Sequence, residues 1–334
     1  MAGGCAILET AANPYILSMG DERTATRRLN IAQTFNPVGA LGGILLSRYF
    51  ILSSLHEADA TERASMSEQA LRQIQHAEFN SVSETYLIIG AVLICLLVFI
   101  RVLKMPEEKD YRVENSENGE RKTKKDGFLS TFGRLAKNYR YIRGVVAQFF
   151  YVGAQTCVWS FTIRYVMATK GWRESEASLI FLWSIIAFTA CRFIFTWLMK
   201  YISPAKLMAW CALIAICATS VVIFANGDFA IVALVLISAC MSLMFPTIYA
   251  ISLENVAPAD RKVGASGLIM AILGGALLTP LQGLFSDVFG ISFSFFVTFF
   301  CFIIVFVYSL SGVRGPRREY ELNDESLTRR PNEA

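Results

Sequence analysis

Glu9 is the residue whose position most strongly suggests chemistry, because it carries the single charge among the first nineteen residues of the chain. The other residues there are apolar or small, as in a helix buried in a membrane. A charged side chain at that depth costs about 2.5–3.5 kcal/mol on insertion scales, so it usually serves binding or proton transfer. Three amides follow it along the chain, at Asn13, Gln33 and Asn36. A carboxylate beside amides can bind hydroxyl groups and can release or accept a proton.

The other reactive side chains point to no catalytic or metal site. All eight cysteines lie in apolar stretches at no spacing typical of metal ligands, and we interpret them as small packing residues. His56 and His76 share a hydrophilic segment, where solvated side chains are the expected state. No serine or cysteine nucleophile is paired with a histidine in the pattern. The sequence therefore predicts neither an enzyme nor a bound cofactor.

Long apolar stretches must position these side chains. The chain has 334 residues, of which 54% are hydrophobic and 17% charged, with a mean hydropathy of +0.45. Its apolar stretches are long enough to cross about 30 Å of hydrocarbon as helices, at about 1.5 Å per residue, and too evenly apolar for membrane strands. The nine predicted spans are Met1–Met19, Ile31–Leu55, Tyr86–Leu103, Gly144–Ile163, Ala177–Met199, Leu207–Gly227, Phe229–Leu253, Val263–Ser286 and Val288–Val313. The predicted fold class is an all-α integral membrane protein.

The charges between the spans predict the orientation. Lysine and arginine cluster in alternate loops, and the positive-inside rule places those loops and the C-terminus in the cytoplasm of a multi-pass plasma-membrane protein. Residues 104–143 form the longest basic segment and are predicted to be a cytoplasmic linker with a short surface helix at Phe128–Lys137. This linker separates an incomplete N-terminal half (1–103) from a six-helix C-terminal half (144–313), which a polar cytoplasmic tail (314–334) follows.

A weak internal repeat connects the two halves. The pattern P-x7-E-x18-L-G-G begins at Pro14 and again at Pro246, so the copies are displaced by 232 positions (246 minus 14). In each copy the proline lies in one span and the glycine pair lies in the next. Secondary transporters are often built from two such halves. A six-helix second half then predicts a six-helix first half, so we expect three further helices to precede the nine in this chain.

The repeat also shows how the halves differ. In the second copy, apolar residues stand where the first copy has its four polar residues. Met241 aligns with Glu9, Phe245 with Asn13, Ala265 with Gln33 and Leu268 with Asn36. If both sets face one cavity, it has a polar wall for hydroxyl groups and an apolar wall for carbon–hydrogen faces, as a sugar requires. The alternative is that the amides only bridge helices, where such hydrogen bonds average about 0.6 kcal/mol.

Several stretches resemble the fucose–proton symporter family, a branch of the major facilitator superfamily that includes glucose and galactose importers. Residues 6–15 (AILETAANPY) and 28–36 (RLNIAQTFN) are similar to the family's helices four and five. Residues 148–156 (QFFYVGAQT) resemble the start of its helix seven, and residues 245–248 and 274–280 resemble parts of helices ten and eleven. The resemblance implies a major facilitator fold of which this chain carries helices four to twelve.

The resemblance also implies an activity, which is proton-coupled uptake of a hexose or 6-deoxyhexose by alternating access. The glutamate is expected to bind the sugar and to carry the proton, while the polar wall and the helix-seven motif supply further contacts. The substrate-binding residues predicted in this way are Glu9, Asn36, Gln33, Asn13, Tyr151 and Gln155. The family's second proton-linked carboxylate is an aspartate in helix one, to which no residue of this chain corresponds.

Several alternatives stay open at this point. The coupling ion is expected to be a proton, with sodium as the alternative, and the identity of the sugar is not fixed. The rival hypothesis is a non-transporting fragment, a sensor or an interaction partner within the membrane. The expected partners are a sugar and the lipid bilayer, without nucleic acid, and the protein is expected to be a monomer.

Charges in or near other spans receive structural interpretations. Arg101 and Arg164 are expected to reach the lipid headgroups from helix ends. Arg192 lies deeper in its span, and we expect it either to reach the headgroups or to pair with an acidic loop residue. Glu22 and Glu254 are related by the repeat and are expected to form gating pairs with basic residues nearby.

Overall fold

The protein is described here by a computed structural model, which consists of two compact units. The larger unit joins Met1–Thr34 to Tyr111–Ala334, and the smaller unit is Phe35–Asp110. Helices are the only regular elements in the residues that the structure describes, which confirms the all-α prediction. Those residues are 2–19, 21, 24–46, 67–103, 128–225, 227–254, 256–257 and 260–313.

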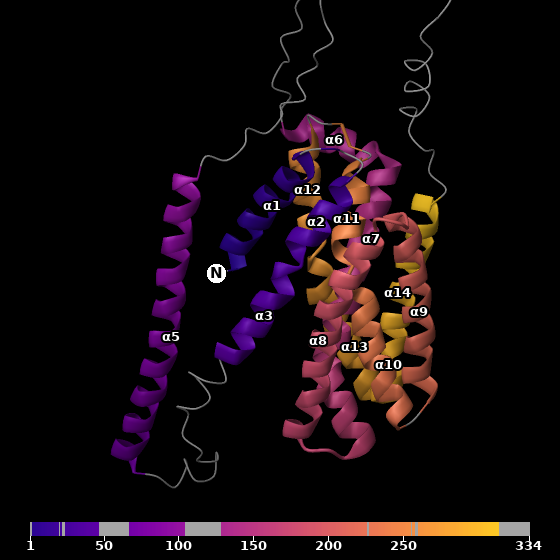
Figure 1. Cartoon of the computed structure of the whole chain (residues 1–334). Coiled ribbons are helices and arrows are strands. Elements are labelled where there is room, and N and C mark those ends of the chain that lie inside the picture. Colours follow the sequence, from indigo (N-terminus) through magenta and orange to yellow (C-terminus); the bar gives the residue numbers. More distant parts are fainter. Residues whose placement is uncertain are drawn as a thin grey trace, which may run out of the picture. The chain divides into compact units, whose positions relative to one another are not determined.

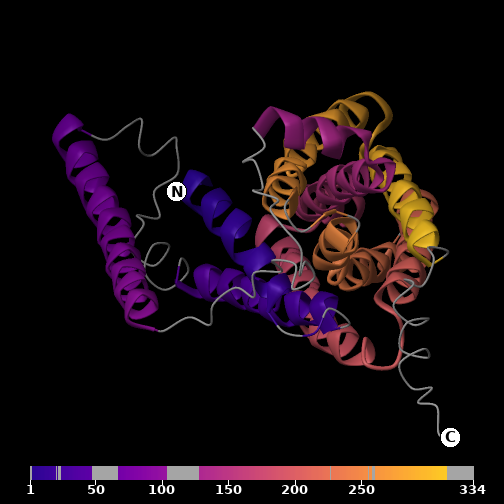
Figure 2. The same ribbon diagram turned by 90° about the horizontal axis from the view of Figure 1, so that it is seen from above.

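The larger unit is a helical bundle (Figures 1 and 2). Its helices are α1 (Ala2–Ser18), α2 (Ala25–Gln33), α6 (Phe128–Lys137), α7 (Tyr139–Lys170), α8 (Glu174–Leu198), α9 (Pro204–Phe224), α10 (Asp228–Met241), α11 (Met244–Glu254), α12 (Arg261–Met270), α13 (Leu273–Phe289) and α14 (Ile291–Val313). Helix α7 packs against α8, α10, α11, α13 and α14, so it runs through the middle of the bundle. The Asn138 side chain caps its first turn, and Gly171 ends it with a left-handed φ of 66°.

Six helical stretches in the described residues are long and apolar enough to cross a membrane. They are Val82–Val102, Glu176–Leu198, Pro204–Phe224, Asp228–Glu254, Arg261–Phe289 and Ile291–Gly312. These stretches correspond to six of the nine predicted spans. The other three predicted spans contain α1, α7, and α2 with the helix that follows it.

Three predicted spans are each divided into two helices. The divided spans are Ile31–Leu55, Phe229–Leu253 and Val263–Ser286. In the first, α2 ends at Gln33 and α3 (Phe35–Leu46) begins two residues later. Prolines explain the first two breaks, because Pro37 and Pro246 have no N–H with which to continue the helical hydrogen bonds.

The short helix α6 matches the predicted surface helix Phe128–Lys137. It lies at the end of the bundle where α7 and α12 begin (Figure 1). Leu135 is buried on its inner side, while Arg134 donates hydrogen bonds of 3.0 and 2.7 Å to the two carboxylate oxygens of Asp260. These bonds hold the pKa of Asp260 below its usual range, although desolvation opposes them. The rest of the predicted linker before Phe128 lies almost entirely outside the described residues.

The smaller unit contains α3 and α5 (Glu68–Val102). The sequence predicts a hydrophilic loop from His56 to Thr85, and its described part corrects this, because the chain is helical from Glu68 onward. Residues 68–85 are polar but contain neither glycine nor proline, so nothing in them interrupts a helix. His76 is exposed on this helix, and His56 lies outside the described residues.

Packing between helices follows the predicted repeat. Helix α1 packs against α12, which is the counterpart of α2 in the second copy. Helix α2 packs against α11, which is part of the counterpart of α1. The glycine pair of the second copy permits close approach, because a Cβ on Gly274 would collide with the carbonyl oxygen of Phe149 in α7. This reciprocal packing agrees with a twofold relation between the copies.

Candidate functional site

Helix α1 presents Glu9 and Asn13 four residues apart, on one face of the helix. Glu9 is half-buried, and the Asn13 side chain is buried. The Gln33 Nε2 donates a hydrogen bond of 3.0 Å to Asn13 Oδ1, which joins α1 to the end of α2. The buried Asn13 Nδ2 has no hydrogen-bond acceptor among the described residues and is available to a ligand. The structure thus brings three of the predicted polar residues together.

Arg192 of α8 is only 3% exposed, and its partners differ from both predictions made for it. Its Nε donates to the Ser242 carbonyl oxygen at 2.6 Å, and its Nη1 donates to the Gln33 carbonyl oxygen at 2.7 Å. Its guanidinium carbon lies 4.9 Å from the centre of the Phe188 ring. Its burial excludes contact with lipid headgroups, and in the described residues its hydrogen-bond acceptors are carbonyls rather than an acidic loop residue.

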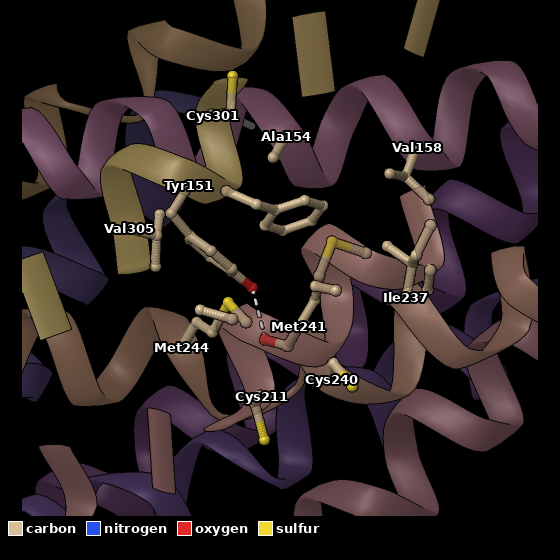
Figure 3. Close-up of a cluster of buried hydrophobic side chains, with 14 of the residues drawn as sticks. Tyr151, Ala154, Val158, Cys211, Ile237, Cys240, Met241, Met244, Cys301 and Val305 are labelled. Carbon is tan, nitrogen blue, oxygen red and sulfur yellow. Dashed lines mark hydrogen bonds between the residues drawn. The ribbon is translucent and has the colours of Figure 1, made fainter. Parts of the chain in front are cut away.

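Aromatic rings from α7 and α11 continue the site. Tyr151 is fully buried and donates from its hydroxyl to the Met241 carbonyl oxygen at 2.9 Å (Figure 3). Its ring centre lies 6.4 Å from that of Phe245, which stacks at 6.4 Å on Tyr249. The Tyr249 hydroxyl is buried without a hydrogen-bond partner. The predicted contact of Tyr151 with a sugar can therefore come from its ring, since its hydroxyl is engaged.

We call these side chains, which come from five helices, the circuit. The Asn13–Gln33 hydrogen bond joins α1 to α2, and Arg192 joins α2 to α8. The Tyr151 ring of α7 faces Phe245 of α11. Glu9 lies on the same face of α1 as Asn13. The circuit combines one carboxylate, two amides, a guanidinium and three aromatic rings.

The predicted apolar wall stays a prediction. Met241, Ala265 and Leu268 are fully buried inside hydrophobic clusters. Phe245 alone joins the circuit, because its neighbour Pro246 lies at the break between α10 and α11. The repeat aligned these positions, but alignment cannot show which side chains lie at a helix break.

Gln148 is a residue that the sequence predictions missed. It is fully buried in α7, and in the part of the chain that the structure describes neither its Oε1 nor its Nε2 has a hydrogen-bond partner. Both atoms are thus available to a ligand or a water molecule. Its spacing was the available signal, because Gln148, Tyr151 and Gln155 follow at i, i+3 and i+7 on one helix face. Gln155 itself is half-buried.

Asn36 lies in α3 of the smaller unit, where its side chain is exposed. Its predicted contact with the sugar stays a prediction. The one described cavity also belongs to the smaller unit, with a volume of about 580 Å³. It is lined only by Ile88, Ala91, Val92, Cys95, Leu96 and Phe99. These side chains offer almost nothing to sugar hydroxyls, so this cavity does not suit such a ligand.

The predicted gating pairs stay a prediction, because one of their two glutamates lies outside the described residues. Glu254 of α11 accepts a hydrogen bond of 3.4 Å from the Thr26 hydroxyl of α2, while Glu22 lies outside the described residues. Arg28 donates to backbone carbonyls, including that of Asp21 at 2.7 Å. Hydrogen bonds between α2 and α11 therefore connect the repeat copies near their loops. The described residues contain no group of three histidine, cysteine or acidic side chains placed to hold a metal ion.

The chain matches the model of the Major Facilitator Superfamily over residues 1–268 and 144–331. It is 37% identical over 317 residues to the L-fucose-proton symporter of Haemophilus influenzae, a match that covers 91% of this chain and 71% of that protein. The L-fucose-proton symporter of Escherichia coli is 34% identical, with 92% and 69% covered. The glucose/galactose transporter of Brucella abortus is 28% identical, with 94% and 70% covered.

A solved structure agrees with these relatives. The crystal structure of the Major Facilitator Superfamily transporter FucP in the outward conformation superposes with a TM-score of 0.82 at 33% identity, covering 91% of this chain and 72% of that one. The predicted major facilitator fold and the predicted resemblance are both confirmed, and the relatives are transporters rather than enzymes. The chain belongs to the fucose–proton symporter family of the Major Facilitator Superfamily.

Proposed function

We propose that this protein takes up a hexose or 6-deoxyhexose together with a proton by alternating access. The observation that carries the proposal is Glu9, a half-buried carboxylate in a circuit of polar and aromatic side chains between membrane helices. The relatives named as L-fucose-proton symporters and glucose/galactose transporters support sugar as the substrate class. In this proposal the protein spans the plasma membrane as a monomer with its C-terminus in the cytoplasm.

The unpartnered polar atoms suggest how a sugar binds. Sugar hydroxyls would accept from Asn13 Nδ2, exchange hydrogen bonds with the Gln148 amide, and bond to the carboxylate of Glu9. The carbon–hydrogen faces of the ring would lie against Phe245 and Tyr249, which stack on each other. Gln33 would hold Asn13 in place, while Asn36, Tyr151 and Gln155 complete the proposed set. Each unpartnered buried group favours binding, because it gains a hydrogen bond that the protein itself does not provide.

Proton coupling follows from the charge of Glu9. When Glu9 binds a proton, the site loses a charge that is costly to keep within a closed membrane helix bundle. The protein would then change its open side only with Glu9 neutral and sugar bound. A membrane potential of 100 mV contributes about 2.3 kcal/mol per proton, which corresponds to about a 50-fold concentration ratio of sugar. A proton is proposed as the coupling ion, and sodium is the alternative to be tested.

The test uses purified protein in proteoliposomes with an imposed proton gradient. L-fucose, D-galactose and D-glucose are compared as labelled substrates, with and without sodium. Glu9→Gln is expected to lower uphill accumulation at least tenfold while exchange of labelled for unlabelled sugar continues, because exchange needs no net proton transfer. Glu174→Gln, at an exposed position in the first turn of α8, is the matched control and should behave as the unchanged protein.

The outcomes separate the alternatives. If Glu9→Gln still accumulates sugar with the normal dependence on pH, Glu9 is not the coupling group. If the unchanged protein binds sugar but shows neither accumulation nor exchange, the sensor or fragment hypothesis is favoured. Accumulation that requires sodium and ignores the proton gradient would reassign the coupling ion.

A further inference from the structure

Two prolines account for both carbonyls that Arg192 binds. In an α-helix the N–H of each residue donates to the carbonyl four positions earlier, and proline has no N–H to donate. Pro37 therefore leaves the Gln33 carbonyl without its helical donor, and Pro246 leaves the Ser242 carbonyl without its own. Arg192 donates to these same two oxygens, at 2.7 and 2.6 Å.

The other helical prolines show that this pairing is specific. Pro14 lies within α1 and Pro280 within α13. By the same rule they release the carbonyls of Thr10 and Ala276. In the described part of the chain no side chain donates to either of those oxygens, and both helices run on without a break. A proline therefore opens a helix here only where a donor meets the released carbonyl.

The electrostatics of the two helix ends favour a cation at this position. α2 ends at Gln33, and α10 ends at Met241, one residue before Ser242. The C-terminal end of a helix carries partial negative charge, so a guanidinium between two such ends is stabilised by both. Hydrogen bonds from a charged donor are also short and strong, as the two distances indicate. Arg192 is nearly fully buried, and losing either carbonyl would leave donors of a buried charge unpaired.

We propose that Arg192 is a positioning residue that joins α2 to the break between α10 and α11, and so fixes Gln33 against Asn13. We call Arg192 with the Gln33 and Ser242 carbonyls the carbonyl clamp. Gln33 uses its backbone carbonyl for the clamp and its side-chain amide for Asn13, so one residue transmits the position of α8 to the polar face of α1. The clamp connects segments of both repeat copies, and the Gln33 bond must break and re-form whenever these copies separate. This last step rests on the proposed transport cycle.

The proposal is tested by a double-mutant cycle between Arg192 and Pro37. Arg192→Met removes the donors at similar side-chain length, and Pro37→Ala restores an N–H that can bond the Gln33 carbonyl inside a continuous helix. Either change alone is expected to lower proton-driven sugar accumulation at least tenfold and to raise the sugar concentration for half-maximal uptake. In the Pro37→Ala protein, adding Arg192→Met should lower proton-driven sugar accumulation by less than a further factor of two. Arg192→Lys should recover part of the activity, because one ammonium can reach one carbonyl.

Pro14→Ala is the matched control, because its released carbonyl has no side-chain donor. Arg192→Met should have its full effect in the Pro14→Ala background. The proposal is overturned if Arg192→Met lowers sugar uptake by the same factor in the Pro37→Ala protein as in the unchanged protein. It is also overturned if the Arg192→Met protein takes up sugar normally. If Arg192→Met does not fold, Arg192→Lys takes its place in the same cycle.

Thermal unfolding of the same variants in detergent separates this proposal from the proposed function. The clamp predicts that Arg192→Met lowers the melting temperature of the unchanged protein more than that of Pro37→Ala. If the unchanged protein fails to transport sugar but this difference is present, the proposed function is wrong and the clamp stands. If transport is normal and the difference is absent, the clamp is wrong and the proposed function stands.

Discussion

The segment of α1 and α2 and the segment of α10 to α12 are copies of one repeat, but they differ in helix continuity and in burial. α1 remains one helix through Pro14, and it presents Glu9 and Asn13 on a half-buried face. The equivalent segment breaks before Pro246, and its Met241 lies fully buried in a hydrophobic cluster. Tyr151 and Arg192 donate to the carbonyls at this break, whereas among the described residues no side chain donates to the Thr10 carbonyl that Pro14 releases in the first copy. The same proline spacing thus gives a binding face in one copy and an anchoring point in the other.

The largest expected effect comes from exchanging Glu9 with its counterpart Met241. Met241→Glu would place a carboxylate in a fully buried apolar cluster, and we expect it to lower the free energy of unfolding by more than about 4 kcal/mol. Glu9→Met should change stability by less than about 0.5 kcal/mol, because the site is half-buried, while abolishing uphill transport. Thermal unfolding and elution as a single species in detergent check both outcomes. Equal tolerance of the two changes would show that the copies do not differ in this way.

The next effect concerns the repeated glycine pair, at Gly42 in the first copy and Gly274 in the second. Gly274→Ala would press a methyl group against the Phe149 carbonyl, and we expect it to destabilise the protein by about 1–3 kcal/mol. A Cβ on Gly42 meets no atom within 4 Å, so Gly42→Ala should be neutral or stabilising by up to about 1 kcal/mol. Melting temperatures of the two variants measure this difference directly. A melting temperature of Gly274→Ala equal to that of the unchanged protein would contradict the close approach.

The sequence predicted the helical class and the family because both depend on long local patterns. Uninterrupted apolar runs identify spans regardless of how they pack. The breaks at Thr34 and Ser242 lie about one helical turn before a proline, but the donor from α8 that binds the released carbonyls comes from the tertiary fold alone. The partners of Arg192 were wrong for the same reason. The loop predicted before Thr85 was wrong because polarity was taken for disorder where helix-forming residues continue.

The candidate site was partly predictable for a similar reason. Glu9, Asn13 and Gln33 stood out as polar residues in apolar spans, and two of them are directly hydrogen-bonded. Gln148 was missed because polarity alone does not distinguish a satisfied amide from one without partners. Three of the four apolar counterparts are fully buried in hydrophobic clusters, which the sequence does not show, since burial depends on neighbours from other helices.

A smaller effect is expected at Asn13 and its counterpart Phe245, which represent the polar and apolar sides of the proposed sugar site. Phe245→Leu removes an aromatic ring from the proposed sugar face, a contact worth about 0.5–1.5 kcal/mol, so sugar affinity should fall about 2- to 12-fold. Asn13→Leu removes the Nδ2 donor proposed for a sugar hydroxyl, and the loss of one such hydrogen bond of about 0.6 kcal/mol should weaken binding about threefold. Calorimetric titration with L-fucose measures both constants. A larger loss at Asn13 than at Phe245 would reverse the proposed division of binding energy.

The smallest effect concerns Arg28 of the first copy and its counterpart Asp260 of the second. Substitutions at these two positions should differ in how their effect on stability depends on pH. Arg134 holds the pKa of Asp260 below its usual value of about 3.9, so the pair stabilises the folded state above that value and ceases to do so as pH falls through the folded pKa. Arg134 is 46% exposed, which limits the contribution to about 0.2–1 kcal/mol. Asp260→Asn should therefore lower the melting temperature slightly at pH 7, and this effect should shrink as the pH falls below about 4. Arg28 binds backbone carbonyls, which do not titrate, so Arg28→Met should have equal effects at both pH values. A pH-independent effect of Asp260→Asn would show that its ion pair with α6 adds no stability in solution.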